Sequence, residues 1–319
     1  MMTPLRIAFF GTPAFAVPTL DALLSSAHPV VGVVTQPDRP RGRGQQVSDS
    51  PVKARALGAG VPILQPTRLK EPEFLDAFRA WNADLAVVAA YGRLLPQVLL
   101  DLPKLGMLNV HASLLPAWRG AAPIQRAVLA GDAVSGVTIM RVVLALDAGA
   151  MLARVELPIE PDDTAGSLEQ RLAVSGALLL REVVDRLARE EPVDEVPQDD
   201  ALATHAPKIE KQEGLIDWSR PAAALDNHVR GMQPWPGAFT FVDGHRLVVR
   251  EAMVDERQAG DVEPGGLVAA DGEAIVLACG EGTTLRVIRV QPEGKRVMTA
   301  RDWLLGRRVD APLRAGAPS

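Results

Sequence analysis

The first half of the chain alternates short apolar runs with longer amphipathic segments, and this alternation restricts the fold more than any other feature. The apolar runs have the length of buried strands and occupy residues 5–10, 29–35, 84–90, 106–111, 136–141 and 152–159. Helical patterns occur at residues 13–26, from 51 onward, 72–81, 123–130 and 164–189. Such a series is typical of parallel strands covered by helices. We therefore expect an α/β fold with a Rossmann-like, mostly parallel sheet and helices on both faces.

Two of the predicted helices begin with the same local signal. Thr12 precedes Pro13, and Ser50 precedes Pro51. A side-chain oxygen at the N-cap can accept a hydrogen bond from a free N–H of the first helical turn, where proline is also tolerated. We therefore expect Thr12 and Ser50 to cap their helices.

The second half of the chain has a different pattern. Short segments of alternating polarity, separated by glycines, lie at residues 238–242, 246–254, 266–269, 274–278 and 284–291. This spacing predicts a small C-terminal antiparallel β-barrel of the OB-like kind. Residues 190–208 are rich in Glu, Asp and Pro and lack apolar periodicity. We predict a domain of residues 1–189, a linker of residues 190–208 and a second domain of residues 209–319.

The cysteine content and the length of the apolar runs indicate the cellular compartment. The only cysteine, Cys279, excludes an internal disulfide and a thiolate metal cluster, and we expect it to fill a small apolar position in a strand. The apolar run near the N-terminus is too short for a signal peptide. Other apolar stretches fall short of the roughly 20 residues that a membrane helix needs. We expect a cytoplasmic protein without a membrane partner.

Three polar side chains form the candidate reacting centre. Asn109 and His111 are two residues apart in a predicted strand, so they share a face near its carboxyl end, where open α/β sheets bind ligands. Asp147 lies in a turn-forming stretch between two later strands. This set suits attack by an amine on a carbonyl. Asn109 and a protonated His111 would donate to the oxyanion, while Asp147 would orient the imidazole and relay protons.

Each of these residues also has a purely structural explanation. A histidine at a strand end is often only a hydrogen-bond partner, and Asn109 and Asp147 could be turn residues. A nucleotide cofactor is not indicated, because the second and third glycines of the dinucleotide fingerprint do not follow Gly11. We expect neither a nicotinamide nor a metal.

The strings Asn109–Pro116 and Trp118–Gln125 together resemble the signature of the 10-formyltetrahydrofolate-dependent formyltransferases. The similarity extends over nearly the whole chain and is greatest to the branch that formylates methionyl-tRNA. It implies that Asn109, His111 and Asp147 are catalytic and that 10-formyltetrahydrofolate is the formyl donor. The implied contacts to this reduced folate come from Tyr91, Gly92, Ser113, Leu114, Leu115 and Pro116.

The chain departs from the family pattern at three positions. Ala117 stands where the family usually has Arg, and Ala150 where it usually has Asp. Val143 occupies a position that is commonly acidic. Asp147 is retained, so the departures affect the shape of the loop around it and the help that a second carboxylate could give in binding folate or tRNA.

The implied acceptor is initiator methionyl-tRNA, whose phosphates require basic contacts. The net charge of the chain is -5, so its basic residues would have to be segregated. Two stretches are basic, residues 36–55 and residues 286–308. The expected tRNA contacts are Arg39, Arg41, Arg43, Lys208, Lys211, Lys295, Arg296, Arg307 and Arg308. Trp118 lies in a loop that must face substrate, and we expect Trp235 to pack in the core.

Three alternatives stay open. An enzyme that formylates a small amine, such as an amino sugar nucleotide or glycinamide ribotide, could use the same three residues. A formyltetrahydrofolate hydrolase would use water in place of the amine, and a tRNA-binding protein could carry a vestigial enzyme domain. The arginine-rich loop and the Trp118–Gln125 string favour formylation of the α-amino group of methionyl-tRNA for translation initiation. We expect the protein to be a monomer.

Overall fold

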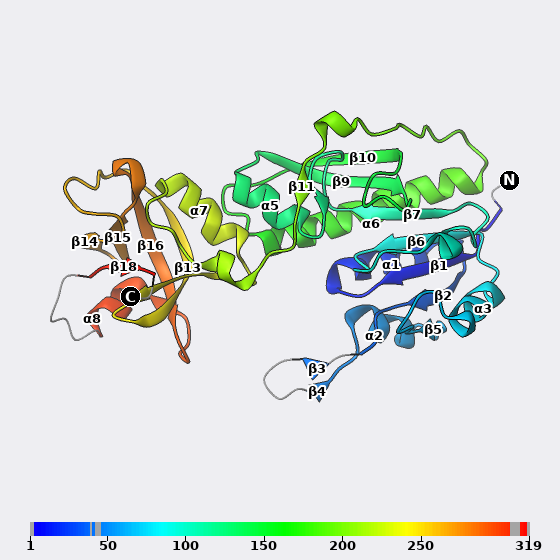
Figure 1. The fold of residues 1–319 in the computed structure, drawn as a ribbon, viewed down its shortest axis with the longest axis horizontal. Coiled ribbons are helices and arrows are strands. Elements are labelled where there is room, and N and C mark those ends of the chain that lie inside the picture. The colour runs from blue at the N-terminus through cyan, green and yellow to red at the C-terminus, as the bar shows by residue number, and fades with distance from the viewer. Residues whose placement is uncertain (1–2, 39, 42–45, 307–312, 318–319) are drawn as a thin grey trace. The chain divides into compact units, whose positions relative to one another are not determined.

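The structure is a computed structural model that describes residues 3–38, 40–41, 46–306 and 313–317. The chain divides into two compact units (Figure 1). The first contains Met1–Pro123, Val134–Pro158 and Glu169–Pro207, and the second contains Ile124–Ala133, Ile159–Leu168 and Lys208–Ser319. Two segments that precede residue 169 thus belong to the same unit as the C-terminal residues, so the units do not follow chain order. The domain boundaries at residues 189 and 208 stay a prediction.

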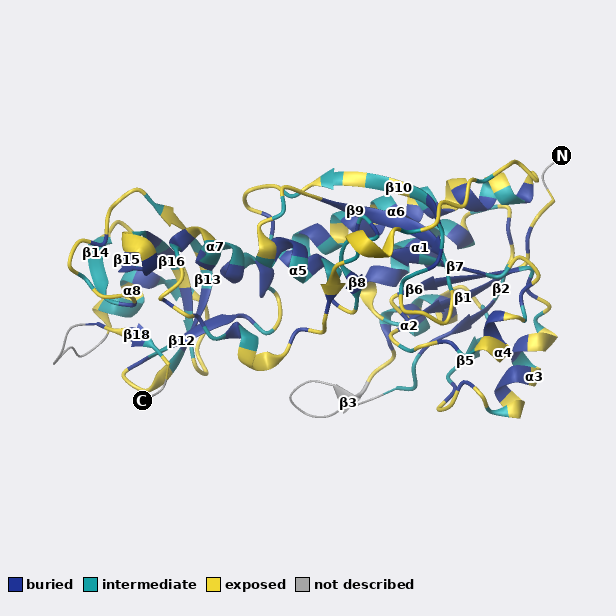
Figure 2. Cartoon of the chain, turned by 45° about the horizontal axis from the view of Figure 1, so that its top comes forward, coloured by how far each residue is buried: buried dark blue, intermediate teal, exposed yellow. Residues whose placement is uncertain are grey.

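The first unit contains a mostly parallel sheet, as predicted. Its strand order is β10-β9-β7-β6-β1-β2-β5. The strands are β1 (Ile7–Gly11), β2 (Val30–Val34), β5 (Ile63–Leu64), β6 (Leu85–Ala89), β7 (Met107–His111), β9 (Val134–Arg141) and β10 (Met151–Pro158). The five strands from β7 to β5 are parallel, while β9 runs antiparallel to β7 and to β10. The central strands β1 and β6 are buried along their full length (Figure 2).

Helices cover both faces of this sheet. Phe78 of α3 (Pro72–Ala80) packs in one apolar cluster with Phe10 and Met107. On the opposite face, Gly176 of α6 (Ala165–Ala188) comes so close to β7 that a Cβ atom would lie 2.9 Å from a methyl carbon of Val110. Because successive side chains of a strand point to opposite faces, Met107 and Val110 identify the two sides. The first unit also contains α1 (Val17–Leu24), α2 (Pro51–Gly58) and α4 (Gln97–Leu100).

The second unit is built on a curled antiparallel sheet, which agrees with the predicted OB-like barrel. Its strand order is β14-β15-β16-β13-β12-β18, with β17 paired to β16. The strands are β12 (Ala238–Val242), β13 (His245–Asp255), β14 (Leu267–Asp271), β15 (Ala274–Ala278), β16 (Thr284–Pro292), β17 (Met298–Thr299) and β18 (Ala315–Gly316). An antiparallel bridge between Gly266 and Arg314 joins the two edges of the sheet. This unit also contains the helices α5 (Pro123–Ala130, apart from its first residue), α7 (Ala222–Gly231) and α8 (Ala300–Leu305).

One of the two predicted helix caps is confirmed and the other is wrong. Ser50 is the N-cap of α2, and its side chain accepts a hydrogen bond from the Lys53 N–H. Thr12 does not cap a helix, because its hydroxyl oxygen instead accepts a hydrogen bond from the Gln36 N–H at 3.3 Å. The competing contact ties the end of β1 to the loop after β2.

The segment expected to be a linker packs on the first unit. Val196 forms an antiparallel bridge with Met151. Further along, β11 (His205–Ala206) pairs in parallel with β8 (Arg119–Gly120), a short strand in the loop after β7. Polar composition alone did not predict these contacts.

Cys279 is buried directly after β15, close to the predicted strand position. Burial raises the pKa of its thiol to about 12, so the group stays protonated near neutral pH. In the part of the chain that the structure describes, no helix is long and apolar enough to span a membrane.

Candidate active site

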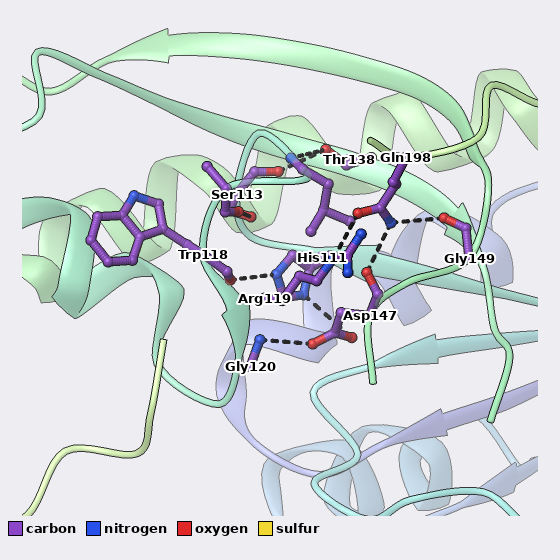
Figure 3. Close-up of polar contacts among 11 residues, drawn as sticks. His111, Ser113, Trp118, Arg119, Gly120, Thr138, Asp147, Gly149 and Gln198 are labelled. Atoms are coloured by element: carbon purple, nitrogen blue, oxygen red, sulfur yellow. Dashed lines mark hydrogen bonds and ion pairs between the residues drawn. The ribbon is translucent and has the colours of Figure 1, made fainter. Parts of the chain in front are cut away.

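His111 is the last residue of β7, and both of its ring nitrogens face protein groups (Figure 3). Nε2 lies 3.0 Å from the backbone carbonyl oxygen of Trp118. A carbonyl only accepts hydrogen bonds, so Nε2 carries the proton. Nδ1 then lies 3.8 Å from Asp147 Oδ1, and both side chains are largely buried. The structure therefore brings together two of the three predicted catalytic residues.

Asp147 is held in a tight turn between β9 and β10. Its φ of 50° is in the left-handed region, which is unusual for a residue with a side chain. Its Oδ2 accepts a hydrogen bond from the Gly120 N–H at 2.9 Å, so Oδ1 is the oxygen that faces His111. The backbone carbonyl of Asp147 accepts a hydrogen bond from the Gln198 amide at 2.8 Å.

Asn109 lies two residues before His111 in β7, with Val88 and Met140 as its register partners on the two neighbouring strands. The residue is half-buried. Strand alternation puts Met107, Asn109 and His111 on one face of β7. The expectation that the two polar residues share a face is consistent with this geometry, while their catalytic roles stay a prediction.

A cavity of about 440 Å³ lies at the start of β7. Met107, Val142, Val143 and Leu144 contribute to its lining, together with Gln97, Leu100, Asp101, Leu105, Gly106 and Arg141. Val143 and Leu144 are 44% and 59% exposed, so apolar side chains form part of its accessible edge. The same face of β7 thus carries the cavity wall at Met107 and the polar residues that follow.

The predicted folate contacts lie outside the lining of this cavity. Leu115 is fully buried in an apolar cluster with Met140 and Met151. The Ser113 hydroxyl, also buried, donates a hydrogen bond to the Ala117 carbonyl at 2.6 Å. Leu114 and Pro116, their neighbours, are half-buried. The folate roles of all four residues stay a prediction.

Tyr91 and Gly92 were also expected to contact folate. Tyr91 is only 1% exposed and packs edge-on against Phe10, with ring centroids 5.4 Å apart. Burial raises the pKa of the Tyr91 phenol. Gly92 has a φ of 79° and lies against the side chain of Gln36. These two roles likewise stay a prediction.

The predicted tRNA contacts are only partly described. Arg39, Arg43, Arg307 and Arg308 lie outside the described residues, and only the backbone of Arg41 is described, in β3 (Pro40–Arg41). Lys208 and Lys211 are exposed near the start of the C-terminal segment, and Lys295 and Arg296 are exposed in the turn between β16 and β17. Their roles in tRNA binding stay a prediction.

Several cations of the two basic stretches are already paired with acidic residues. Lys53 forms ion pairs with Asp38 and Asp49. Arg286 lies 2.9 Å from Asp255 and 3.1 Å from Asp271. Counting charges along the sequence therefore overstates the number of cations that are available to phosphates.

The core assignment of Trp235 is wrong. The residue is 54% exposed, in a turn that precedes β12. Trp235 lies between two prolines, outside any periodic segment, so the sequence did not indicate whether its side chain is buried or exposed. Trp118 is half-buried and has a φ of 62°. Its carbonyl oxygen accepts the hydrogen bond from His111 Nε2.

Gln198 and Arg119 are the contacts that sequence reasoning missed. The Gln198 amide donates to the carbonyls of Asp147 and Gly149, both at 2.8 Å. Its oxygen accepts a hydrogen bond from Arg119 Nε at 2.9 Å. Arg119 is part of the motif and could have been singled out, whereas Gln198 lies in the supposed linker and carried no signal.

Residues 5–184 match the family described as formyl transferase, and residues 208–308 match the family described as formyl transferase, C-terminal domain. The chain is 47% identical over 308 residues to the methionyl-tRNA formyltransferase of Citrifermentans bemidjiense, covering 97% of this chain and 95% of the relative. It is 49% identical over 300 residues to the methionyl-tRNA formyltransferase of Methylococcus capsulatus, covering 94% and 96%.

Solved structures show the same fold at lower identity. WlaRD, a sugar 3N-formyl transferase, aligns with a TM-score of 0.67 and 14% identity, covering 92% of this chain and 99% of that chain. The N-formyltransferase from Helicobacter canadensis aligns with a TM-score of 0.65 and 14% identity, covering 90% and 99%. These likenesses concern the fold alone.

Proposed function

The chain belongs to the formyl transferase family, and from that membership we propose that it transfers the formyl group of 10-formyltetrahydrofolate to the α-amino group of initiator methionyl-tRNA. Full-length similarity to relatives named methionyl-tRNA formyltransferases, at 47% and 49% identity, supports this acceptor. One structural observation supports the chemistry above all others. The buried His111 Nδ1 lies 3.8 Å from Asp147 Oδ1, and the first residue of the same strand lines the cavity.

The amine of the acceptor attacks the formyl carbon and forms a tetrahedral oxyanion. Asn109 can donate its amide N–H to this oxygen. Donation from His111 would require the substrate to displace either the Trp118 carbonyl or Asp147 from the ring. We therefore assign the oxyanion mainly to Asn109, a narrower role for His111 than the sequence suggested.

His111 and Asp147 form a route for the proton. The attacking amine loses a proton as its nitrogen bonds to carbon, and the leaving folate nitrogen gains one as its bond to carbon breaks. His111 Nδ1 and Asp147 Oδ1 face each other, and each can carry this proton. Their 3.8 Å separation is too long for a direct hydrogen bond, and such contacts often tighten when substrate binds.

The cavity at the start of β7 is the proposed site for the pterin end of the formyl donor. Its volume of about 440 Å³ lies within the usual range for small-molecule sites. Apolar side chains such as Met107 and Val142 can contact an aromatic ring, while Gln97 and Asp101 supply polar groups. The face of β7 then leads from this cavity to Asn109 and His111.

The test is a formyl-transfer assay with 10-formyltetrahydrofolate and a panel of acceptors. We expect rapid formylation of methionyl-tRNA and little transfer to amino sugar nucleotides, glycinamide ribotide or water. Preferred formylation of a small amine, or hydrolysis that matches the rate of transfer, would disprove the proposed acceptor. Sedimentation and cell fractionation test the further proposals that the enzyme is monomeric and cytoplasmic.

A further inference from the structure

We propose that Gln198 is a positioning residue for the transfer reaction, because it holds the Asp147 turn so that the carboxylate faces His111. The inference rests on the proposed function and adds to it a residue from outside the signature motif. Gln198 would not touch substrate. It would act on the reaction only through Asp147.

The hydrogen bonds of Gln198 define its orientation. The amide nitrogen has two hydrogens, and it donates to the carbonyl oxygens of Asp147 and Gly149, each at 2.8 Å (Figure 3). The amide oxygen accepts from Arg119 Nε at 2.9 Å. With the amide flipped, an oxygen would face two carbonyls and a nitrogen would face a guanidinium. Only one orientation of this side chain therefore fits its surroundings.

The turn that Gln198 holds has little freedom on its other side. A Cβ atom at Gly149 would lie 1.9 Å from the Arg141 carbonyl oxygen, so the turn is already pressed against the end of β9. Asp147 is kept at a φ of 50°, which its surroundings must stabilise. The two hydrogen bonds from Gln198 reach the carbonyls of Asp147 and Gly149, on either side of Ala148.

The chain segment around Gln198, residues 196–206, also holds the backbone N–H that binds the Asp147 carboxylate. Gly120 donates its N–H to Asp147 Oδ2 at 2.9 Å, and Gly120 belongs to β8. The partner of β8 is β11, which begins seven residues after Gln198. Arg119, which orients the Gln198 amide, also lies in β8. Residues 196–206 thus hold both the backbone and the carboxylate of Asp147 in place.

The first test compares Gln198→Met with Gln198→Glu. Methionine keeps the length of the side chain and removes all three hydrogen bonds. Glutamate keeps an acceptor for Arg119 but places an oxygen against two carbonyls. We expect both variants to lower kcat by about 10- to 100-fold with little change in KM for either substrate, because a displacement of about 1 Å can cost this much. Full activity of Gln198→Glu would overturn the proposal.

The control is Gln212→Met, which makes the same chemical change at an exposed glutamine in η3 (Lys211–Gly214). It should keep the wild-type kcat. Thermal unfolding of each variant shows whether a loss of activity reflects loss of fold. If Gln198→Met does not fold, the comparison of Gln198→Glu with wild type decides the question.

A double-mutant cycle separates positioning from a merely structural role. If Gln198 acts through Asp147, then adding Gln198→Met to Asp147→Asn should lower kcat by less than twofold. A structural role would give losses that multiply, and that result would refute the inference. Failure of wild type to formylate methionyl-tRNA would instead refute the proposed function, whatever Gln198 does.

Discussion

At the scale of single residues, the reacting centre is held largely by backbone groups. The Trp118 carbonyl accepts a hydrogen bond from His111 Nε2, and the Gly120 N–H donates to Asp147. Asn109 differs, because its side chain makes no hydrogen bond within the described residues. A half-buried amide without a partner leaves its N–H donors available to a ligand. This is the property that an oxyanion donor requires.

Replacement of Asn109 should affect the chemical step. We expect Asn109→Ala to lower kcat for formyl transfer by roughly 10²- to 10³-fold, the usual effect of losing one oxyanion donor. Asn109→Asp keeps the shape but replaces the donor with an acceptor, so its loss should be at least as large. Single-turnover assays with methionyl-tRNA measure both. A wild-type rate for either variant would remove Asn109 from the mechanism.

His228 in α7 should make stability depend on pH. Burial lowers its pKa below the ordinary value of 6.5, and the residue is 7% exposed. As the pH falls below that value, the unfolded chain binds a proton that the folded chain rejects. Stability is therefore full above about pH 6.5 and decreases on acidification, by at most about 1.4 kcal/mol per pH unit for one group.

Unfolding measured at pH 7.5 and pH 5.5 tests this expectation. His228→Gln should lose less stability between the two conditions than wild type does. His245→Gln, at an exposed histidine in β13, serves as the control and should behave as wild type. Identical pH dependence in wild type and His228→Gln would rule out a contribution from this residue.

At the scale of elements, β7 positions the chemistry and its neighbours fix its register. Both β6 and β9 pair with β7 at Asn109. The loops after β7 and β9 supply the remaining contacts. The loop after β7 provides the Trp118 carbonyl, and the turn after β9 provides Asp147. A strand held on both sides can present His111 more rigidly than a loop could.

The cap of α2 illustrates how one side chain supports an element. The buried Ser50 hydroxyl accepts from the Lys53 N–H at 3.2 Å and lies 3.0 Å from the Thr35 hydroxyl. We expect Ser50→Ala to lower the free energy of unfolding by about 1–2 kcal/mol. Ser48→Ala, at an exposed position nearby, is the control. Equal unfolding curves for the two variants would contradict the importance of the cap.

The cavity edge offers a test of the donor site. Leu144 lines the cavity and is 59% exposed, so Leu144→Asp should leave the core intact. Loss of apolar contact with the pterin should raise KM for 10-formyltetrahydrofolate by about tenfold, with KM for tRNA unchanged. Leu57→Asp makes the same change in α2 at 55% exposure, outside the cavity lining, and should keep both values. Equal kinetics of the two variants would argue against this cavity as the donor site.

At the scale of the whole molecule, the distribution of charge matters more than its sum. The net charge is -5, yet the proposed acceptor is a polyanion. Ion pairs such as Arg257 with Asp271, 2.7 Å apart, neutralise part of the basic surface. Lys295 and Arg296 are exposed and adjacent, which makes them better candidates for phosphate contacts.

Replacing both exposed residues should weaken tRNA binding. We expect the double variant Lys295→Ala with Arg296→Ala to reduce the slope of log affinity against log salt by roughly 0.7–0.9 for each lost phosphate contact. Binding titrations with methionyl-tRNA at several salt concentrations measure this slope. Arg257→Ala removes a paired cation of the same unit and should change the slope little. An unchanged slope in the double variant would exclude these two residues from the interface.

Local patterns predicted most of the regular structure. The boundaries of α5, β12 and β15 agree with the sequence prediction. Short elements such as α4 and β8 were missed, because segments of a few residues carry no measurable period. The ten-residue helix α7 was missed as well. Residue type and spacing singled out Asn109, His111 and Asp147 as candidates, and the resemblance of the surrounding strings to a formyltransferase signature implied their catalytic roles.

The sequence by itself determined the α/β class of the first half, the positions of its longer strands and helices, and the choice of Asn109, His111 and Asp147 as candidates whose catalytic roles stay a prediction. Only the tertiary structure decided that Gln198 holds the Asp147 turn, that Trp235 is exposed and that a cavity opens at the start of β7. The physical reason is the separation along the chain of the residues that interact. Periodicity and spacing report interactions between residues that are near in the chain, whereas Gln198 meets Asp147 only because distant segments pack together.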